Sequence, residues 1–222
     1  YTYSNSVKHI RLYERFGYNT NYLTAILSRN IAPKPLPEGI SYQLFSTMDA
    51  ANRRDSLKQI EELTDEICQG LTVSREVDRG AQSSKNIRSE TILVYERGQL
   101  IGFALCPMAS LKAKTRPLYA KFAAAKNGSK ASRAGAYNFE ESNFEEPYLG
   151  ERNFEALIAS LDQHGQKIGA SQILGAVSTA RRSCYKRMLS LGFTPNAYGI
   201  AMIKPDLSAY NVDGIYVLDD WR

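Results

Sequence analysis

The sequence predicts an α/β (α+β) fold in which helices flank a mixed, mostly antiparallel central sheet. Short apolar runs suited to strands alternate with longer stretches whose apolar residues recur at helical spacing. Apolar residues make up 43% of the 222 residues, which is ample for a packed core. A basic helix followed by glycine and an aromatic residue occurs twice, at residues 178–193 and at residues 6–18. These observations predict one complete domain preceded by part of a related one.

The two copies of this motif share a tyrosine on the helix. Tyr185 precedes Gly192 in the longer copy, and Tyr13 precedes Gly17 in the copy near the start. Glycine suits the left-handed conformation that commonly follows the last helical residue, so each helix is expected to end at its glycine. We interpret Tyr13 as the equivalent of Tyr185.

The N-terminal part of the chain is predicted to be separate from the main domain. Residues 1–32 fit the last helix and strand of a preceding repeat, with the helix over 5–16 and the strand over 23–31. Residues 33–39 are rich in proline and cannot continue either element, so they are expected to form a linker. The main domain then spans residues 40–222.

The main domain alternates between strand and helix patterns. Apolar residues recur at helical spacing over residues 50–70, and Arg97-Gly98 marks a hairpin turn between two apolar strands. The segment at about 127–147 has few large aliphatic residues and is expected to be an exposed insertion. The other predicted strands and helices are 41–47, 90–95, 100–107, 118–125, 173–177, 197–203 and 215–218 (strands) and 154–168 and 181–191 (helices).

Composition argues against several classes of protein. Cys68, Cys106 and Cys184 match no zinc or redox spacing, so we expect structural thiols, no metal and a reducing compartment. No apolar run approaches the ~20 residues of a membrane span and no stretch resembles a signal peptide, so we expect a cytoplasmic protein with no membrane partner. The net charge of +5 comes from scattered basic residues without a recognised nucleic-acid motif, which argues against nucleic acid as a partner.

The order of these elements, with a helix that leads through Tyr185 into Gly192-Phe193 and then two final strands, resembles the GCN5-related N-acetyltransferases (GNATs). The resemblance covers residues 40–222 as a whole domain with the GNAT-like acyl-CoA N-acyltransferase fold. The first segment, together with the terminal Leu218–Arg222, resembles a bacterial branch with tandem GNAT domains. The resemblance therefore implies that this chain is the C-terminal part of a longer polypeptide.

The resemblance also implies where acetyl-CoA binds as co-substrate. In GNATs it lies in a splay between the fourth and fifth strands, where its pantetheine pairs with strand backbone. The fourth strand here is Tyr119–Ala125, which assigns Lys121, Phe122 and Ala123 to the cofactor. The pyrophosphate meets the amino end of the next helix, where unpaired N–H groups and the helix dipole attract phosphate without a metal.

The phosphate loop departs from the family pattern. The usual run of Gln or Arg, two residues, Gly, one residue, then Gly or Ala does not follow the fourth strand. We place the phosphate turn at Gly150, which opens a helix, with Arg152 and the Asn153 amide as further donors. The alternatives are a turn at Gly128 or no phosphate site at all, and Glu151 would oppose the phosphates in the favoured turn.

Tyr185 is the predicted catalytic residue. The resemblance implies that a neutral amine attacks the thioester while a nearby phenol protonates the departing CoA thiolate. The alternative is that Tyr185 only packs its helix against the sheet. Ser178 and Arg181 are further candidates for cofactor binding. Ser178 could instead cap the helix, and Arg181 could lie on an exposed basic helix face.

Two hypotheses follow. The first is an N-acetyltransferase that moves the acetyl group from acetyl-CoA to a primary amine of a small-molecule or peptide acceptor, by direct attack in a ternary complex. The second is a non-catalytic GNAT-like scaffold or ligand-sensing domain with a degenerate cofactor site, since fold alone does not establish chemistry. A homodimer or a tandem GNAT domain is the possible protein partner in either case. The acceptor and the general base are not assigned.

Overall fold

The structure, a computed structural model, describes residues 2–81, 89–107, 117–127, 149–204 and 210–219. Within these ranges the strands form two five-stranded sheets. The two sheets meet along the segment 117–125, which contributes one strand to each of them.

The first sheet has the strand order β10-β7-β5-β4-β3, and all its neighbours are antiparallel. Buried residues run along β4 and β5 without alternation, because helices cover both faces of this sheet. Its strands are β3 (Ile40–Leu44), β4 (Ser89–Glu96), β5 (Gln99–Pro107), β7 (Phe122–Ala125) and β10 (Val217–Asp219).

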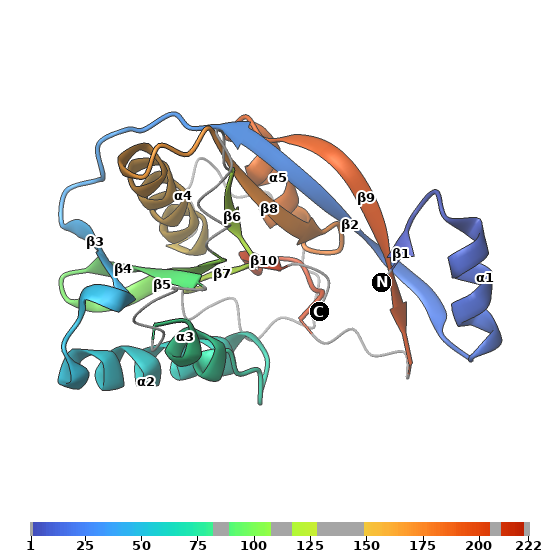
Figure 1. The fold of residues 1–222 in the computed structure, drawn as a ribbon, viewed down its shortest axis with the longest axis horizontal. Helices are drawn as coiled ribbons and strands as arrows, with labels where there is room; N and C mark the ends of the chain where they lie inside the picture. Colours follow the sequence, from blue (N-terminus) through green and yellow to red (C-terminus); the bar gives the residue numbers. More distant parts are fainter. Residues whose placement is uncertain (1, 82–88, 108–116, 128–148, 205–209, 220–222) are drawn as a thin grey trace, which may run out of the picture.

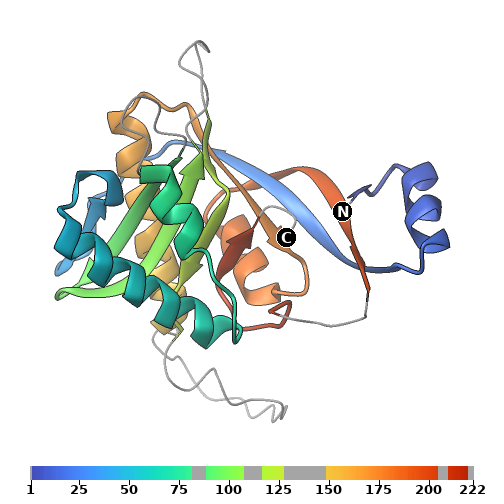
Figure 2. The same ribbon diagram turned by 60° about the horizontal axis from the view of Figure 1, so that its bottom comes forward.

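Three helices sandwich the first sheet. Helix α4 (Leu149–Lys167) covers one face, and α2 (Ala50–Ile67) and α3 (Ser74–Ala81) cover the other (Figures 1 and 2). The predicted helix over 50–70 corresponds to α2, which begins where the carboxylate of Asp49 accepts hydrogen bonds from two backbone N–H groups of the first turn.

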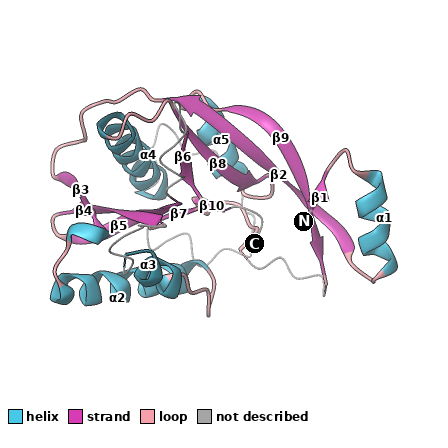
Figure 3. Ribbon diagram, viewed as in Figure 1, coloured by secondary structure: helices cyan, strands magenta, loops and turns pink. Residues whose placement is uncertain are grey.

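The second sheet has the strand order β1-β9-β2-β8-β6, and only β6 and β8 are parallel neighbours in it. Helix α5 (Arg182–Ser190) packs against β8 (Figure 3). The strands of this sheet are β1 (Thr2–Tyr3), β2 (Asn19–Asn30), β6 (Pro117–Ala120), β8 (Gln172–Ser178) and β9 (Thr194–Ile203).

The N-terminal segment is joined to the main domain through this sheet. Strand β2 lies between β8 and β9 and pairs antiparallel with both. The helix that precedes it, α1 (Val7–Arg15), projects from the end of the molecule in Figure 1. A strand from the first part of the chain therefore completes the sheet of the main domain.

The structure confirms the predicted fold class, a mostly antiparallel sheet flanked by helices, and it corrects two elements. The strand predicted over 41–47 ends at Leu44, because a 3-10 turn, η1 (Phe45–Thr47), follows it. The final strand, predicted over 215–218, begins at Val217 and ends at Asp219, where it pairs with β7. Most of the expected insertion at 127–147 lies outside the described residues. Among the helices that are described, none is long and apolar enough to cross a membrane.

Candidate functional site

The splay predicted beside the fourth strand is present in the structure. The fourth strand is interrupted at Lys121, whose backbone N–H donates to the carbonyl of Leu105 at 2.9 Å. Before the interruption β6 pairs in parallel with β8 as far as Gly175, whereas β7 after it pairs with β5. Strand β7 and the second half of β8 therefore diverge.

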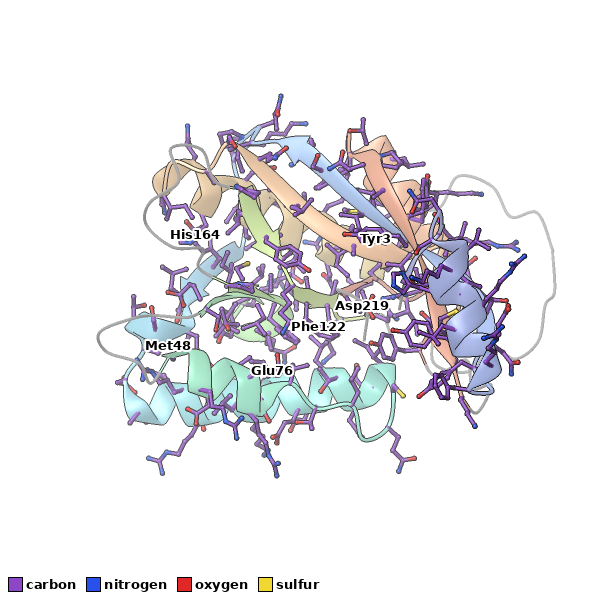
Figure 4. The ribbon with its side chains drawn as sticks, turned by 45° about the vertical axis from the view of Figure 1, so that its right-hand side comes forward. Tyr3, Met48, Glu76, Phe122, His164 and Asp219 are labelled. Carbon is purple, nitrogen blue, oxygen red and sulfur yellow. The ribbon has the colours of Figure 1, made fainter. Side chains whose placement is uncertain are left out.

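The chain's own C-terminal strand lies in this splay. Strand β10 pairs antiparallel with β7, with Leu218 opposite Ala123 and Asp219 opposite Phe122. Figure 4 shows Asp219 beside Phe122. On its other side β10 contacts β8, where a Cβ on Gly175 would lie 3.1 Å from a methyl carbon of Leu218. Both edges of β7 are therefore used, one by β5 and one by β10.

The residue before β10 reaches the amino end of α4. The carbonyl of Tyr216 accepts a hydrogen bond of 3.0 Å from the N–H of Ala125. A Cβ on Gly150 would lie 3.1 Å from the Tyr216 ring and 2.6 Å from Oδ1 of Asn127. Residues 216–219 thus run from the amino end of α4 along β7. The GNAT resemblance assigns this same path to pyrophosphate and pantetheine.

A buried ion pair holds β10 in the splay. Arg181 is 0% exposed and donates to a carboxylate oxygen of Asp219 at 2.6 Å and to the carbonyl of Val217 at 2.7 Å. The other carboxylate oxygen of Asp219 accepts from the hydroxyl of Tyr210 at 2.7 Å. A buried charge needs both a partner and hydrogen bonds, and this arrangement supplies them.

Two residues of α5 are buried beside β8 and β10. The thiol of Cys184 lies 3.8 Å from the carbonyl of Val217, and burial raises the pKa of this thiol to about 12. Met188 is fully buried, with its methyl 3.9 Å from the position of a Cβ on Gly175. The surface that α5 presents to the splay is therefore a neutral thiol and a thioether beside the paired Arg181.

Tyr185 lies on a different side of α5. Its hydroxyl is 3.1 Å from the hydroxyl of Tyr198 on β9. This hydrogen bond, followed by burial, raises the pKa of Tyr185 to about 12. The phenol is therefore protonated at neutral pH, and its described partner is another phenol.

The hydrogen bonds that end the two repeated helices correct the alignment of their tyrosines. After α1 the N–H of Tyr18 donates to the carbonyl of Tyr13, and after α5 the N–H of Phe193 donates to the carbonyl of Met188. The glycine between the bonded residues has a positive φ in both cases, 77° in α1 and 88° in α5. Met188, and not Tyr185, is therefore the structural equivalent of Tyr13.

Solved structures share this architecture. A GCN5-related N-acetyltransferase from Sphaerobacter thermophilus matches with a TM-score of 0.54 and 15% identity, over 94% of this chain and 61% of that chain. A putative acetyltransferase from Pyrococcus horikoshii matches with a TM-score of 0.55 and 10% identity, over 99% of this chain and 58% of that one. The chain has the GNAT fold. It spans about three fifths of these structures. No family model and no curated protein matches the sequence.

Within the GNAT fold, the residues predicted to hold phosphate have protein partners. Arg152 donates to Glu96 at 2.6 Å, and the buried amide of Asn153 donates to the carbonyl of Lys126 at 2.9 Å. Glu151, expected to oppose phosphate, lies 3.1 Å from Nε of Arg187. Gly150 is covered as described above, and Gly128 lies outside the described residues.

The three residues of the fourth strand that were predicted to bind the cofactor, Lys121, Phe122 and Ala123, also contact other parts of the protein. Phe122 and Ala123 are fully buried, and their backbones lie in the ladders with β5 and β10. The amine of Lys121 points to the other side, where it lies 3.6 Å from a carboxylate oxygen of Glu76 and lines a hollow of about 640 Å³. The structure thus places Phe122 and Ala123 at the splay and turns the Lys121 side chain away from it.

Ser178 does not cap α5 and Arg181 does not lie on an exposed helix face, the two alternatives to cofactor binding that the sequence offered. Ser178 is buried at the end of β8, where its hydroxyl accepts from the N–H of Ala180 at 3.3 Å. It is not the cap of α5, because Arg181 occupies the N-cap position. The suggestion that Arg181 lies on an exposed basic face is wrong, since its guanidinium is buried against Asp219.

Sequence reasoning missed Asp219 and Tyr210 as parts of this site. The only signal in the sequence was Asp219, a carboxylate directly after the short apolar strand predicted over 215–218. A carboxylate in that position is equally typical of a buried residue paired with a cation and of an exposed residue at the end of a strand. The partner, Arg181, is 38 residues away in the sequence, so spacing alone could not connect the two.

Proposed function

We propose that this chain is a non-catalytic GNAT-fold domain whose cofactor position is filled by its own C-terminal strand. The observation that carries this proposal is the pairing of β10 with β7 in the splay. The backbone edge that pantetheine would use is already bonded, and Tyr216 covers the amino end of α4 where pyrophosphate would bind.

Energetic magnitudes support a closed splay. Exposing Val217 and Leu218, both fully buried, costs about 3–6 kcal/mol for the two side chains. Separating the buried pair of Arg181 and Asp219 costs about 3–5 kcal/mol more. A ligand that bound an open splay with micromolar affinity would gain about 8 kcal/mol. Displacement of β10 would therefore consume essentially all of that binding free energy.

The identity of residue 188 supports the same proposal. In α1 the position four residues before the terminal glycine is Tyr13, whereas in α5 it is Met188. Met188 faces the splay but has no proton to donate to a departing thiolate. The splay of the described domain therefore lacks a phenol at the position where the other copy of the motif has one.

The second candidate is the N-acetyltransferase, with acetyl-CoA as co-substrate and Tyr185 as the general acid toward the thiolate. The specific observation in its favour is the Tyr185–Tyr198 hydrogen bond, which keeps the phenol protonated as a general acid must be. The amine acceptor would attack the thioester directly in a ternary complex. This candidate requires β10 to leave the splay before acetyl-CoA binds.

Residues 1–32 are proposed to be the last helix and strand of a preceding GNAT-like repeat, with 33–39 as the linker. The matching hydrogen bonds at the ends of α1 and α5 support this assignment. A cytoplasmic location is proposed as well. The three cysteines are free thiols, as is usual in a reducing compartment.

Calorimetric titration with acetyl-CoA separates the two candidates. The unaltered chain is expected to show no binding up to millimolar cofactor, and micromolar binding would contradict the closed splay. The same titration with Asp219→Asn, which weakens the anchor of β10, tests the second candidate, and Glu62→Gln at an exposed ion pair is the matched control. Acetyl-CoA binding and amine acetylation by Asp219→Asn alone would favour the transferase. Absence of both in a folded variant would favour the non-catalytic domain.

A further inference from the structure

A hollow of about 480 Å³, which we call the β3 hollow, lies at the edge of the first sheet. Its walls come from β3, from the segment that leads into α2 and from the end of α4. In the strand order β10-β7-β5-β4-β3, three strands separate β3 from the strand that fills the splay. Figure 4 shows Met48 and His164, from two of these walls, at the end of the molecule away from α1. The β3 hollow is therefore a separate feature from the splay.

Two buried polar groups at the β3 hollow have no hydrogen-bond partner among the described residues. They are Nε2 of His164, a residue only 5% exposed, and the hydroxyl of Tyr42. The two rings meet edge to face with their centroids 6.5 Å apart, and both line the hollow. A buried polar group without a partner costs free energy, so such groups are nearly always bonded. A ligand in the hollow that bonds to both groups removes this cost.

The imidazole of His164 is neutral at neutral pH. Burial lowers its pKa, and Lys167 lowers it further, whereas the carboxylate of Glu90 on β4 acts in the opposite direction. A neutral imidazole carries one N–H, and in the tautomer with the proton on Nε2 it is a hydrogen-bond donor. The hydroxyl of Tyr42 is a donor as well. This wall of the hollow therefore offers two donors to a ligand that has acceptor oxygens.

A cation adjoins these two donors. The amine of Lys167 lies 4.9 Å from the centroid of the Tyr42 ring, and Lys167 also lines the hollow. None of the ion pairs in the described part of the chain involves this amine. One ammonium and two hydrogen-bond donors on one wall suit a carboxylate, because hydrogen bonds to an ionised acceptor are stronger than those to a neutral one.

Negative groups beside the hollow limit the charge that a ligand can carry. The carboxylate of Asp49, which lines the hollow, accepts hydrogen bonds from two backbone N–H groups of α2. The buried carboxylate of Glu90 accepts from the hydroxyl of Ser46 at 2.5 Å and from the N–H of Thr91 at 3.0 Å. Both carboxylates are held in place by these donors and repel a doubly charged anion more than a singly charged one. The surroundings therefore favour a monoanion.

We propose that the β3 hollow binds a small organic molecule with a single carboxylate group. Tyr42, His164 and Lys167 hold the carboxylate, and the rest of the molecule lies against the apolar side chains of Leu44 and Met48. The volume of the hollow falls in the range of about 300–1,000 Å³ that is typical of small-molecule sites. The proposal does not depend on whether the splay binds acetyl-CoA, because none of these residues belongs to the splay.

NMR of the imidazole groups tests the proposal in the unaltered chain. His164 and His9 are the two histidines of the sequence, and exposed His9 on α1 is an internal control. The probes are benzoate, neutral benzamide of nearly the same shape, and sulfate as a dianion. Benzoate is expected to shift the His164 resonances with a Kd on the order of 1 mM, and to leave those of His9 unchanged. Benzamide and sulfate are expected to bind about tenfold more weakly. The bound carboxylate is also expected to raise the pKa of His164.

Two variants assign the contacts. Tyr42→Phe keeps the ring but removes the hydroxyl, and is expected to weaken benzoate binding about tenfold. Lys167→Gln changes an exposed residue, so the fold is retained, and about fivefold weaker binding is expected. Lys186→Gln, at an exposed position of α5, is the matched control and is expected to leave the affinity unchanged.

Four outcomes would overturn the proposal. The first is that His164 shows no shift at benzoate concentrations tenfold above the expected Kd, which would leave the hollow to water. Equal affinity for benzoate and benzamide would show that the carboxylate is not recognised. Tighter binding of sulfate than of benzoate would assign the hollow to inorganic anions. Unchanged affinity in both Tyr42→Phe and Lys167→Gln would place the probe outside the β3 hollow.

Discussion

Asp219→Asn is expected to destabilise the domain strongly, because the carboxylate of Asp219 neutralises a fully buried arginine. Asp219 is 2% exposed and accepts hydrogen bonds from Arg181 at 2.6 Å and from Tyr210 at 2.7 Å. The substitution preserves side-chain size but removes the negative charge. The guanidinium of Arg181 then stays buried without a carboxylate to balance its charge, with the carbonyl of Val217 at 2.7 Å and Oδ1 of Asn211 at 3.5 Å as neutral acceptors.

The expected magnitude follows from this burial. Removing one member of a buried ion pair costs about 3–5 kcal/mol, because the remaining charge stays in a low-dielectric site. The exposed pair of Lys58 and Glu62 on α2 provides the comparison, since surface pairs of this spacing contribute about 0.3–0.5 kcal/mol. Glu62→Gln is therefore the matched control for a carboxylate-to-amide change.

The assay is urea unfolding of the unaltered chain and both variants, followed by circular dichroism. Amide hydrogen exchange of Val217 and Leu218 reports on β10 separately from the rest of the domain. We expect a loss of about 3–5 kcal/mol in Asp219→Asn and faster exchange at both amides. If Asp219→Asn lost less than about 1 kcal/mol, as expected for an exposed pair, the assignment of β10 to a buried, ion-paired splay would be refuted.

Three other predictions concern separate parts of the molecule. Tyr185→Phe removes the hydrogen bond to Tyr198 and is expected to lower the free energy of unfolding, measured in urea, by about 1 kcal/mol. If the chain transfers acetyl groups, an unchanged rate of transfer by this variant across pH would exclude Tyr185 as the general acid. Gly150→Ala places a Cβ 2.6 Å from Oδ1 of Asn127 and is expected to lower the thermal midpoint without added cofactor, so an unchanged midpoint would contradict the tight contact at the start of α4. Burial lowers the pKa of His164 below 6.5, against Glu90, which raises it, so the unfolded chain binds the proton more readily. The stability from neutral His164 is therefore lost as pH falls below 6.5, with a slope of up to about 1.4 kcal/mol per pH unit, and His164→Gln should show a shallower acid loss in urea unfolding at pH 5–7.

Secondary structure was largely predictable because it depends on neighbouring residues. The spacing of Ile60 and Leu63 predicted α2, and both side chains are buried on its inner face. The glycines after α1 and α5 adopt the left-handed conformation that their position predicted. These signals act within one or two helical turns, so no long-range contact is needed to see them.

One error in the candidate site was avoidable from the sequence. The tyrosines of the two motif copies were matched by residue type, whereas the distance to the terminal glycine identifies the equivalent positions. Counting four residues back from Gly17 gives Tyr13, and counting four back from Gly192 gives Met188. The hydrogen bonds that end both helices confirm this second alignment.

The sequence alone determined most of the strands and helices in their order, the glycines at which α1 and α5 end and the resemblance to GNATs. Only the tertiary structure decided what lies in the splay. The location of β10 depends on β7 for backbone pairing, on α5 for Arg181 and on the segment before the strand for Tyr210. These groups come from separate parts of the chain, and their attraction exists only after folding has buried them together. Local sequence patterns carry no record of such a contact, because hydrogen bonding and charge pairing in the core depend on distance in space.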